Sequence, residues 1–247
     1  MKKTAIAILI AVLVVAIGAG LVFAGLSAVN FKFWDLDTTE YVTNTHEVGE
    51  SFTRVEMDMD MAGVNILPAE DGKCRVVCVE REKYPHAVHV DNGTLIVRSA
   101  KNQTWNASIF SIGITIKSPS VTLYLPAADY ESLKLEADTG AVKLGVGLSF
   151  EAVDVDADTG SIRVTDVVCS GDMRIEADTG SIRLEDVDAA NLYLDADTGS
   201  ISGTIRTPKT FVAKSATGSV KVPDTTGEGR CEAHADTGSI RLSIVGE

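Results

Sequence analysis

Positive charge is scarce in this chain. Its 247 residues include 22 Lys and Arg against 35 Asp and Glu, so the net charge is −13 with histidine neutral. Lys2 and Lys3 are the only charged residues before Asn30, which leaves −15 on residues 30–247. Nucleic acids are bound by clustered Lys and Arg, and anionic lipid surfaces attract the same side chains. The composition therefore argues against both kinds of partner, although acidity alone selects no other.

Metal-binding and disulfide patterns are also lacking. Cys74 and Cys78 lie four residues apart on a predicted strand, about 13 Å, and so cannot bridge each other. His86 and His89 flank the start of a strand and are expected to point to opposite faces, which argues against a metal pair. We expect buried thiols, with a bridge from Cys74 or Cys78 to a distant cysteine left open, and neither a metal ion nor a cofactor. None of the cysteines has the paired C-x-x-C spacing that binds zinc: Cys74, Cys78, Cys169 and Cys231.

One long apolar run stands at the N-terminus. Thr4–Val29 holds 26 uncharged residues, which as a helix span about 39 Å against about 30 Å for a bilayer core. The apolar part of a secretory signal is only about 7–15 residues long. We therefore predict an uncleaved signal anchor over residues 1–30, although cleavage after Val22-Phe23-Ala24 stays open. With Lys2 and Lys3 in the cytoplasm, the C-terminal domain lies outside a cell membrane that the chain crosses once.

A short phrase recurs six times in the second half of the chain. Ala-Asp-Thr-Gly occurs five times and Ser-Ala-Thr-Gly once, at Ser215–Gly218, and the threonines are 20, 20, 19, 19 and 20 residues apart. Apolar and polar residues alternate around each copy, as in strands, and Asp-Thr-Gly suits a tight turn. A period of this size indicates one stacked unit. The predicted structural turns hold Thr139, Gly140, Thr159, Gly160, Thr179, Gly180, Thr198, Gly199, Thr217, Gly218, Thr237 and Gly238.

These repeats predict an all-β fold, a single-stranded β-solenoid similar to a parallel β-helix, with rungs of about 20 residues and one transmembrane helix before it. Residues 31–51 are predicted as a juxtamembrane stalk, residues 52–130 as an irregular cap with the first rung, and residues 131–247 as the regular solenoid. The irregular loop with Trp105 and Phe110 is either a contact site or a plug over the first rung. The last copy, Ala235–Gly238, should form the final rung, whose open edge is a candidate surface for self-association.

Acidic side chains should form two rows along the stack. Like charges about 4.8 Å apart repel each other, and Ca²⁺ bound between successive turns would relieve that repulsion. One row comes from the turns: Asp138, Asp158, Asp178 and Asp197. The other stands two residues before each turn aspartate: Glu136, Asp156, Glu176 and Asp195.

A metal-free explanation of the acidic rows is favoured. Lys214 and Ala216 interrupt both rows in the fifth copy, and the spacing differs from that of calcium-binding repeats. Turn hydrogen bonds and a cationic row can offset the acids instead; that row contains Lys143, Arg163 and Arg183. Asp-Thr-Gly is also the catalytic phrase of aspartic proteases, but six uniform copies do not provide two distinct loops that face a cleft. We therefore predict no catalytic residues.

The anchor, the segments Val55–Ile66 and Val121–Pro126, and the run of Thr-Gly-Ser-Ile steps together resemble a bacterial family of unknown function. Its members are described as adhesins with β-strand repeats, a label given by similarity. The resemblance covers roughly residues 50–247. It implies a membrane-anchored surface protein, with an accessory role in envelope-stress signalling, and it has no established catalytic residues to transfer.

The function predicted from the sequence is a non-enzymatic binding or scaffold module of the bacterial cell envelope. Its partners would be the membrane, through the N-terminal helix, and a protein or a cell-wall glycan. Two alternatives stay open: a polysaccharide-active enzyme, since many parallel β-helices cleave acidic sugars, and a calcium-binding repeat protein. The short and nearly uniform rungs argue against the enzyme, because such enzymes build a cleft from loop insertions.

Overall fold

The computed structural model describes residues 41–100 and 118–246, together with Gly18, and the strands belong to one compact unit. Apart from Gly18, the predicted anchor over residues 1–30 lies outside the described residues, and so do residues 31–40 of the predicted stalk and the loop with Trp105 and Phe110. Among the residues that are described, no helix has the length and apolar character needed to cross a membrane.

The described chain is all-β and resembles a solenoid, as predicted. Its eighteen strands are β1 (Tyr41–Glu47), β2 (Arg54–Met59), β3 (Gly63–Pro68), β4 (Arg75–Arg81), β5 (Ala87–Asp91), β6 (Thr94–Arg98), β7 (Ser120–Leu125), β8 (Asp129–Thr139), β9 (Val142–Leu144), β10 (Leu148–Thr159), β11 (Ile162–Thr165), β12 (Val167–Thr179), β13 (Ile182–Thr198), β14 (Ile201–Ile205), β15 (Thr210–Thr217), β16 (Val220–Lys221), β17 (Arg230–Thr237) and β18 (Ile240–Ile244).

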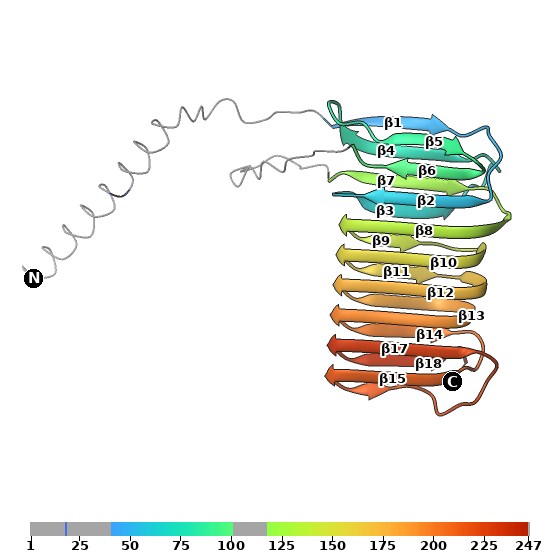
Figure 1. The fold of residues 1–247 in the computed structure, drawn as a ribbon, viewed down its shortest axis with the longest axis vertical. Coiled ribbons are helices and arrows are strands. Elements are labelled where there is room, and N and C mark those ends of the chain that lie inside the picture. The colour runs from blue at the N-terminus through green and yellow to red at the C-terminus, as the bar shows by residue number, and fades with distance from the viewer. Residues whose placement is uncertain (1–17, 19–40, 101–117, 247) are drawn as a thin grey trace, which may run out of the picture. The chain divides into compact units, whose positions relative to one another are not determined.

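Two mostly parallel sheets face each other (Figure 1). Sheet A has the spatial order β1-β4-β7-β3-β9-β11-β13-β14-β18-β16, and its β1–β4 and β4–β7 pairs are antiparallel. Sheet B has the order β5-β6-β2-β8-β10-β12-β13-β17-β15, with only the β5–β6 pair antiparallel. The long strand β13 contributes its first part to sheet A and its second part to sheet B.

The core lies between the two sheets because the apolar positions of every rung alternate and stack. Val155, Ile175 and Leu194 are in register on β10, β12 and β13, and each is at most 2% exposed. The alternating polar residues of the same strands point outward. Neighbouring rungs therefore bury the thin apolar row that a single rung would leave in water.

The repeated turns stack as closely as backbone permits. The N–H of Gly160 donates to the carbonyl of Thr179 at 2.9 Å, and the same bond recurs at Gly180. Gly160 has φ +151°, and a Cβ there would lie 1.9 Å from the carbonyl oxygen of Gly140. Only glycine fits this contact, because any side chain would collide with the backbone of the adjacent turn.

Both ends of the stack depart from sequence order, so the prediction that the last copy forms the final rung is wrong. The last copy, β17–β18, lies between β13–β14 and the fifth copy, β15–β16, which is the terminal rung. At the other end, β2–β3 is covered by β6–β7, which comes later in the chain. The part expected as a stalk also differs, because β1 pairs with β4 throughout its length.

Candidate functional site on the outer face of sheet B

The outer face of sheet B carries one acidic residue at the same position of five successive strands. We call this row the acidic ladder. Arg98 stands beside it at one end, and His234 followed by Lys214 extends the row at the other. The ladder consists of Asp58, Glu136, Asp156, Glu176 and Asp195, all paired in register.

The turn aspartates form a second row two residues further along each strand. Asp138, Asp158, Asp178 and Asp197 are exposed there, as the register of the strands requires. The fifth copy, which has Ala216 at this position, ends this row instead of interrupting it, since it is the terminal rung. In the acidic ladder, His234 and then Lys214 follow Asp195 at the end of the row, so Lys214 does not interrupt it and the interruption expected from the sequence is wrong.

Each acidic row contains a carboxyl group with a raised pKa. Partial burial and then the charges of Asp158 and Asp60 raise the pKa of Asp138 above its ordinary value. Partial burial and then the charges of Glu176 and Asp178 do the same to the pKa of Asp156. A carboxylate that resists ionisation in this way would be stabilised by a nearby positive charge.

The counter-charges differ from those predicted. Lys134 lies 2.7 Å from Glu136, and Arg174 donates to Glu176 at 2.8 Å, so cations on sheet B itself offset two ladder acids. The predicted row lies on sheet A, where Arg163 and Arg183 contact Glu185 at 2.7 and 3.0 Å. No ion pair within the described chain joins that row to the ladder, because the two rows lie on different sheets.

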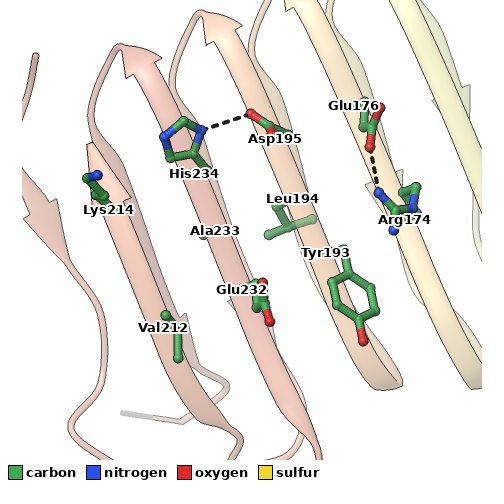
Figure 2. Close-up of a pocket in the computed structure, with 10 residues that line it drawn as sticks. All are labelled: Arg174, Glu176, Tyr193, Leu194, Asp195, Val212, Lys214, Glu232, Ala233 and His234. Carbon is green, nitrogen blue, oxygen red and sulfur yellow. Dashed lines mark hydrogen bonds and ion pairs between the residues drawn. The ribbon is translucent and has the colours of Figure 1, made fainter. Parts of the chain in front are cut away.

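A shallow hollow of ≈ 460 Å³ lies where the ladder meets its cationic end (Figure 2). Arg174 and Glu176 pair on one side, and His234 Nδ1 lies 3.3 Å from Asp195 Oδ1 on the other. The guanidinium carbon of Arg174 is 5.4 Å from the centre of the Tyr193 ring. The hollow is an open surface of mixed charge, and it is lined by Arg174, Glu176, Tyr193, Leu194, Asp195, Val212, Lys214, Glu232, Ala233 and His234.

A family model described as Toastrack DUF4097 matches residues 52–247, which is most of the chain. The chain belongs to the Toastrack DUF4097 family. This agrees with the resemblance that the turn repeats and the segments Val55–Ile66 and Val121–Pro126 indicated. No curated protein matches this Toastrack chain.

Several solved structures resemble the Toastrack domain. The "putative cell adhesion protein" of Clostridium sporogenes is 14% identical, with a TM-score of 0.49 over 83% of this chain and 100% of that chain. The "putative adhesin" of Bacteroides fragilis is 13% identical, with a TM-score of 0.49 over 83% and 98%. The "putative lipid binding protein" of Parabacteroides distasonis is 15% identical, with a TM-score of 0.27 over 82% and 95%. These TM-scores lie below 0.5, so the family placement rests on the family model.

A second polar cluster of the Toastrack domain lies inside its N-terminal end. Glu80 is 1% exposed and accepts hydrogen bonds from Asn44 Nδ2 at 2.5 Å and from the backbone N–H of His86 at 2.6 Å. Burial raises the pKa of Glu80, but the hydrogen bonds from Asn44 and His86 outweigh this and hold it below its ordinary value. Glu80 is therefore ionised although it is buried.

The four cysteines are buried, as predicted, and none of them forms the disulfide that the sequence left open. Burial raises the pKa of Cys74 to about 11 and those of Cys78 and Cys231 to about 12. Thiols held protonated in this way are poor nucleophiles. The surroundings of Cys78 are polar, because Glu80 and His86 lie beside its thiol.

Most residues of the hollow could not be identified from the sequence. Asp195 and His234 are 39 residues apart, and they meet only because the last copy pairs with β13. The one available signal was that the fifth copy lacks its aspartate and carries Lys214, which is typical of a capping repeat. Glu80 was also missed, although a glutamate at an inward position of an alternating strand, after Val76 and Cys78, marks a buried polar site.

Proposed function

We propose that this protein is a non-enzymatic binding or scaffold module, held at the outer side of a bacterial cell membrane by residues 1–30, and that sheet B presents its contact surface. Family membership and the charged, open outer face support this role. The partner we propose is an envelope component, a protein or a glycan, that presents regularly spaced positive charges. The family resemblance implies an accessory role in envelope-stress signalling, so a protein of that system is one candidate for such a partner.

The observation that carries the proposal is the acidic ladder together with the hollow at its end. The ladder repeats one kind of side chain at the strand spacing of about 4.8 Å, so it matches an extended partner better than a compact one. Partial burial and then repulsion from neighbouring acids, Glu176 first, raise the pKa of Asp156. A bound cation removes that repulsion and steers the approach of the partner.

A variant in which three acids of the hollow are replaced by their amides tests the contact surface. The full-length protein in detergent is titrated with poly-L-lysine as the probe, and Glu176→Gln, Asp195→Asn and Glu232→Gln are combined in one variant. Three exposed ion pairs at roughly 0.2–1 kcal/mol each predict about a tenfold loss of affinity. The matched control combines Glu70→Gln, Glu82→Gln and Glu228→Gln, which removes the same net charge from exposed positions elsewhere. Equal losses in both variants would show that only net charge matters and would overturn the proposed surface.

Protease treatment of intact cells tests the placement. A C-terminal tag after Glu247 is expected to be cleaved from intact protoplasts, because the domain lies outside the membrane. If cleavage occurs only after lysis, the domain lies in the cytoplasm and the proposed placement is wrong. A cytoplasmic protein serves as the control for membrane integrity.

A further inference from the structure

The cationic row expected from the sequence runs along the outer face of sheet A, over six successive strands from β9 to the terminal strand β16. The positions of the row are paired in register, and Ser202 of β14 is the one uncharged member. Neighbouring positions are therefore about 4.8 Å apart along the stack. The cations are all exposed, and in spatial order they are Lys143, Arg163, Arg183, Arg241 and Lys221.

The charge of this row is neutralised only in part. Arg163 and Arg183 share the carboxylate of Glu185, at 2.7 and 3.0 Å. The other three cations of the row form no ion pair with another residue that the structure describes, and the acidic ladder lies on the other sheet. Like charges on adjacent strands repel each other at this spacing. The row therefore keeps a surplus of positive charge, and an anionic partner would relieve the repulsion within it.

Serine hydroxyl groups line the side of the row that faces the repeated turns. They stand two residues before the positions of the row, and they accept backbone N–H groups of the next rung. Ser181 Oγ accepts from Ser200 at 3.2 Å, and Ser200 Oγ accepts from Ser239 at 3.3 Å. A hydroxyl group that accepts in this way still has its own hydrogen to donate. The row and the serines together thus offer hydrogen-bond donors to a partner rich in negative charge and acceptors.

The surroundings of the row indicate which kind of polyanion fits. The segments of the six strands that belong to sheet A contain no aromatic residue. Single-stranded nucleic acids are bound by stacking their bases on aromatic side chains, so this surface does not suit them. A row that repeats over several rungs matches an extended polymer, and the serine hydroxyl groups can pair with the hydroxyl groups of sugars. These features favour an acidic carbohydrate chain.

We propose that the cationic row binds a linear acidic polysaccharide, which lies along the stack with its carboxylates against the cations and its hydroxyl groups against the serines. A guanidinium group can hold a carboxylate through two parallel hydrogen bonds, so the arginines orient the polymer as well as attract it. The acidic ladder lies on the opposite outer face of the solenoid, where it does not repel the polymer at close range. Sheet A thus provides a contact surface that is separate from the one proposed on sheet B.

Binding of polygalacturonate, a linear polymer with one carboxylate per sugar, tests this proposal. The full-length protein in detergent and EDTA is titrated with polygalacturonate and with uncharged dextran. We expect binding of polygalacturonate alone, and added NaCl should weaken it. Lys143→Gln combined with Lys221→Gln should lower the affinity about fivefold, because two exposed charge pairs are lost. The matched control is Lys73→Gln with Lys83→Gln, exposed lysines outside the row, and it should bind as the wild type does.

A separate variant keeps the test valid if the double variant does not fold. Arg241→Gln should lower the affinity for polygalacturonate about twofold. Poly-L-glutamate and polyphosphate are titrated as other polyanions and should bind more weakly, because they lack sugar hydroxyl groups. Three results would overturn the proposal: no binding of polygalacturonate to the folded wild type, equal losses in the row variant and its matched control, or tighter binding of either other polyanion. None of these results affects the test of sheet B with poly-L-lysine.

Discussion

At the scale of single residues, the turn glycines are required because they have no Cβ atom. In each inner turn, a Cβ added to the glycine would almost coincide with a carbonyl oxygen of the neighbouring turn. The distance between the two atoms would be 1.8 Å at Gly180 and 1.7 Å at Gly199. The hydrogen bonds of these turns run along the stack and depend on the same close approach. The recurrence of Thr-Gly in the sequence is thus a consequence of stacking.

Gly180→Ala is expected to destabilise the protein by about 3 kcal/mol or more, because its Cβ would collide with the Gly160 carbonyl in a backbone of φ +158°. Gly49→Ala is the control, since nothing lies within 4 Å of its added Cβ, and it should change stability by less than about 1 kcal/mol. Urea unfolding measures both. Equal effects of the two substitutions would contradict the stacking argument.

The acidic ladder predicts an unusual pH dependence. A raised pKa means that the folded state holds the Asp156 proton more tightly than the unfolded chain does. Its contribution favours folding at low pH and is lost as the pH rises above the ordinary value of 3.8. Asp156→Asn should therefore raise the melting temperature at about pH 7 and have little effect at about pH 3.

Glu185 on sheet A provides the comparison of opposite sign. A hydrogen bond from Arg183, together with the charge of Arg163, lowers the pKa of Glu185, and these contributions outweigh a smaller desolvation effect. Its contribution to stability is present at neutral pH and is lost as the pH falls through its folded pKa. Glu185→Gln should thus lower the melting temperature at about pH 7. If both substitutions shift the melting temperature at about pH 7 in the same direction, the opposite pKa shifts of Asp156 and Glu185 do not determine their effects.

At the scale of elements, the position of a strand in the sheet matters more than its position in the chain. β17 is bonded on both sides, to β13 and β15, although it comes near the C-terminus. Within the part of the chain that the structure describes, β15 pairs with β17 alone and is largely exposed, so it forms the open edge. Ser215 and Ala216 replace the usual Ala-Asp there, as expected of a capping repeat.

Hydrogen exchange should distinguish these two strands. We expect slower exchange over Arg230–Thr237 than over Thr210–Thr217, because a doubly paired strand opens less often than an edge strand. Mass spectrometry of deuterated peptides measures both segments in one experiment. Equal protection would mean that the β15 edge is covered, and dependence of that protection on protein concentration would identify a second copy as the cover.

At the scale of the whole molecule, charge dominates. The −15 on residues 30–247 is concentrated in part on one face, where the acidic ladder and the turn aspartates run side by side. Ladder neighbours are closer together than the Debye length of about 10 Å at 0.1 M salt, so added salt screens them only in part. Cations within sheet B, such as Lys134 and Arg174, offset part of the remaining repulsion between the ladder acids.

Added NaCl should raise the melting temperature of the full-length protein, because screening weakens repulsion along the ladder. Ca²⁺ at matched ionic strength should not raise the melting temperature further, since Lys134 and Arg174 already form ion pairs with two of the ladder acids. Calorimetry with EDTA, NaCl and CaCl₂ measures this. A large extra increase with Ca²⁺ that Asp158→Asn combined with Asp178→Asn removes would establish the turn aspartates as a calcium site.

Much of the fold follows from the sequence alone. The alternation around each Thr-Gly predicts the strands, their inward faces and the turns, because these depend on neighbours within a few residues and on contacts that every rung repeats. The register of the acidic ladder follows in the same way, since Glu136, Asp156 and Glu176 each stand two residues before an equivalent aspartate.

The order of the rungs was decided only by the tertiary structure. Every repeat offers an equivalent edge, so local pattern cannot choose between neighbours, and β17 reaches β13 through the connection of residues 222–229. That choice places His234 and Lys214 at the end of the ladder and leaves β15 at the edge. The cluster of Cys78, Glu80 and His86 likewise depends on a chain reversal that brings His86 back to β4. Alternation determines which way a side chain points, whereas long-range pairing determines which side chains it meets.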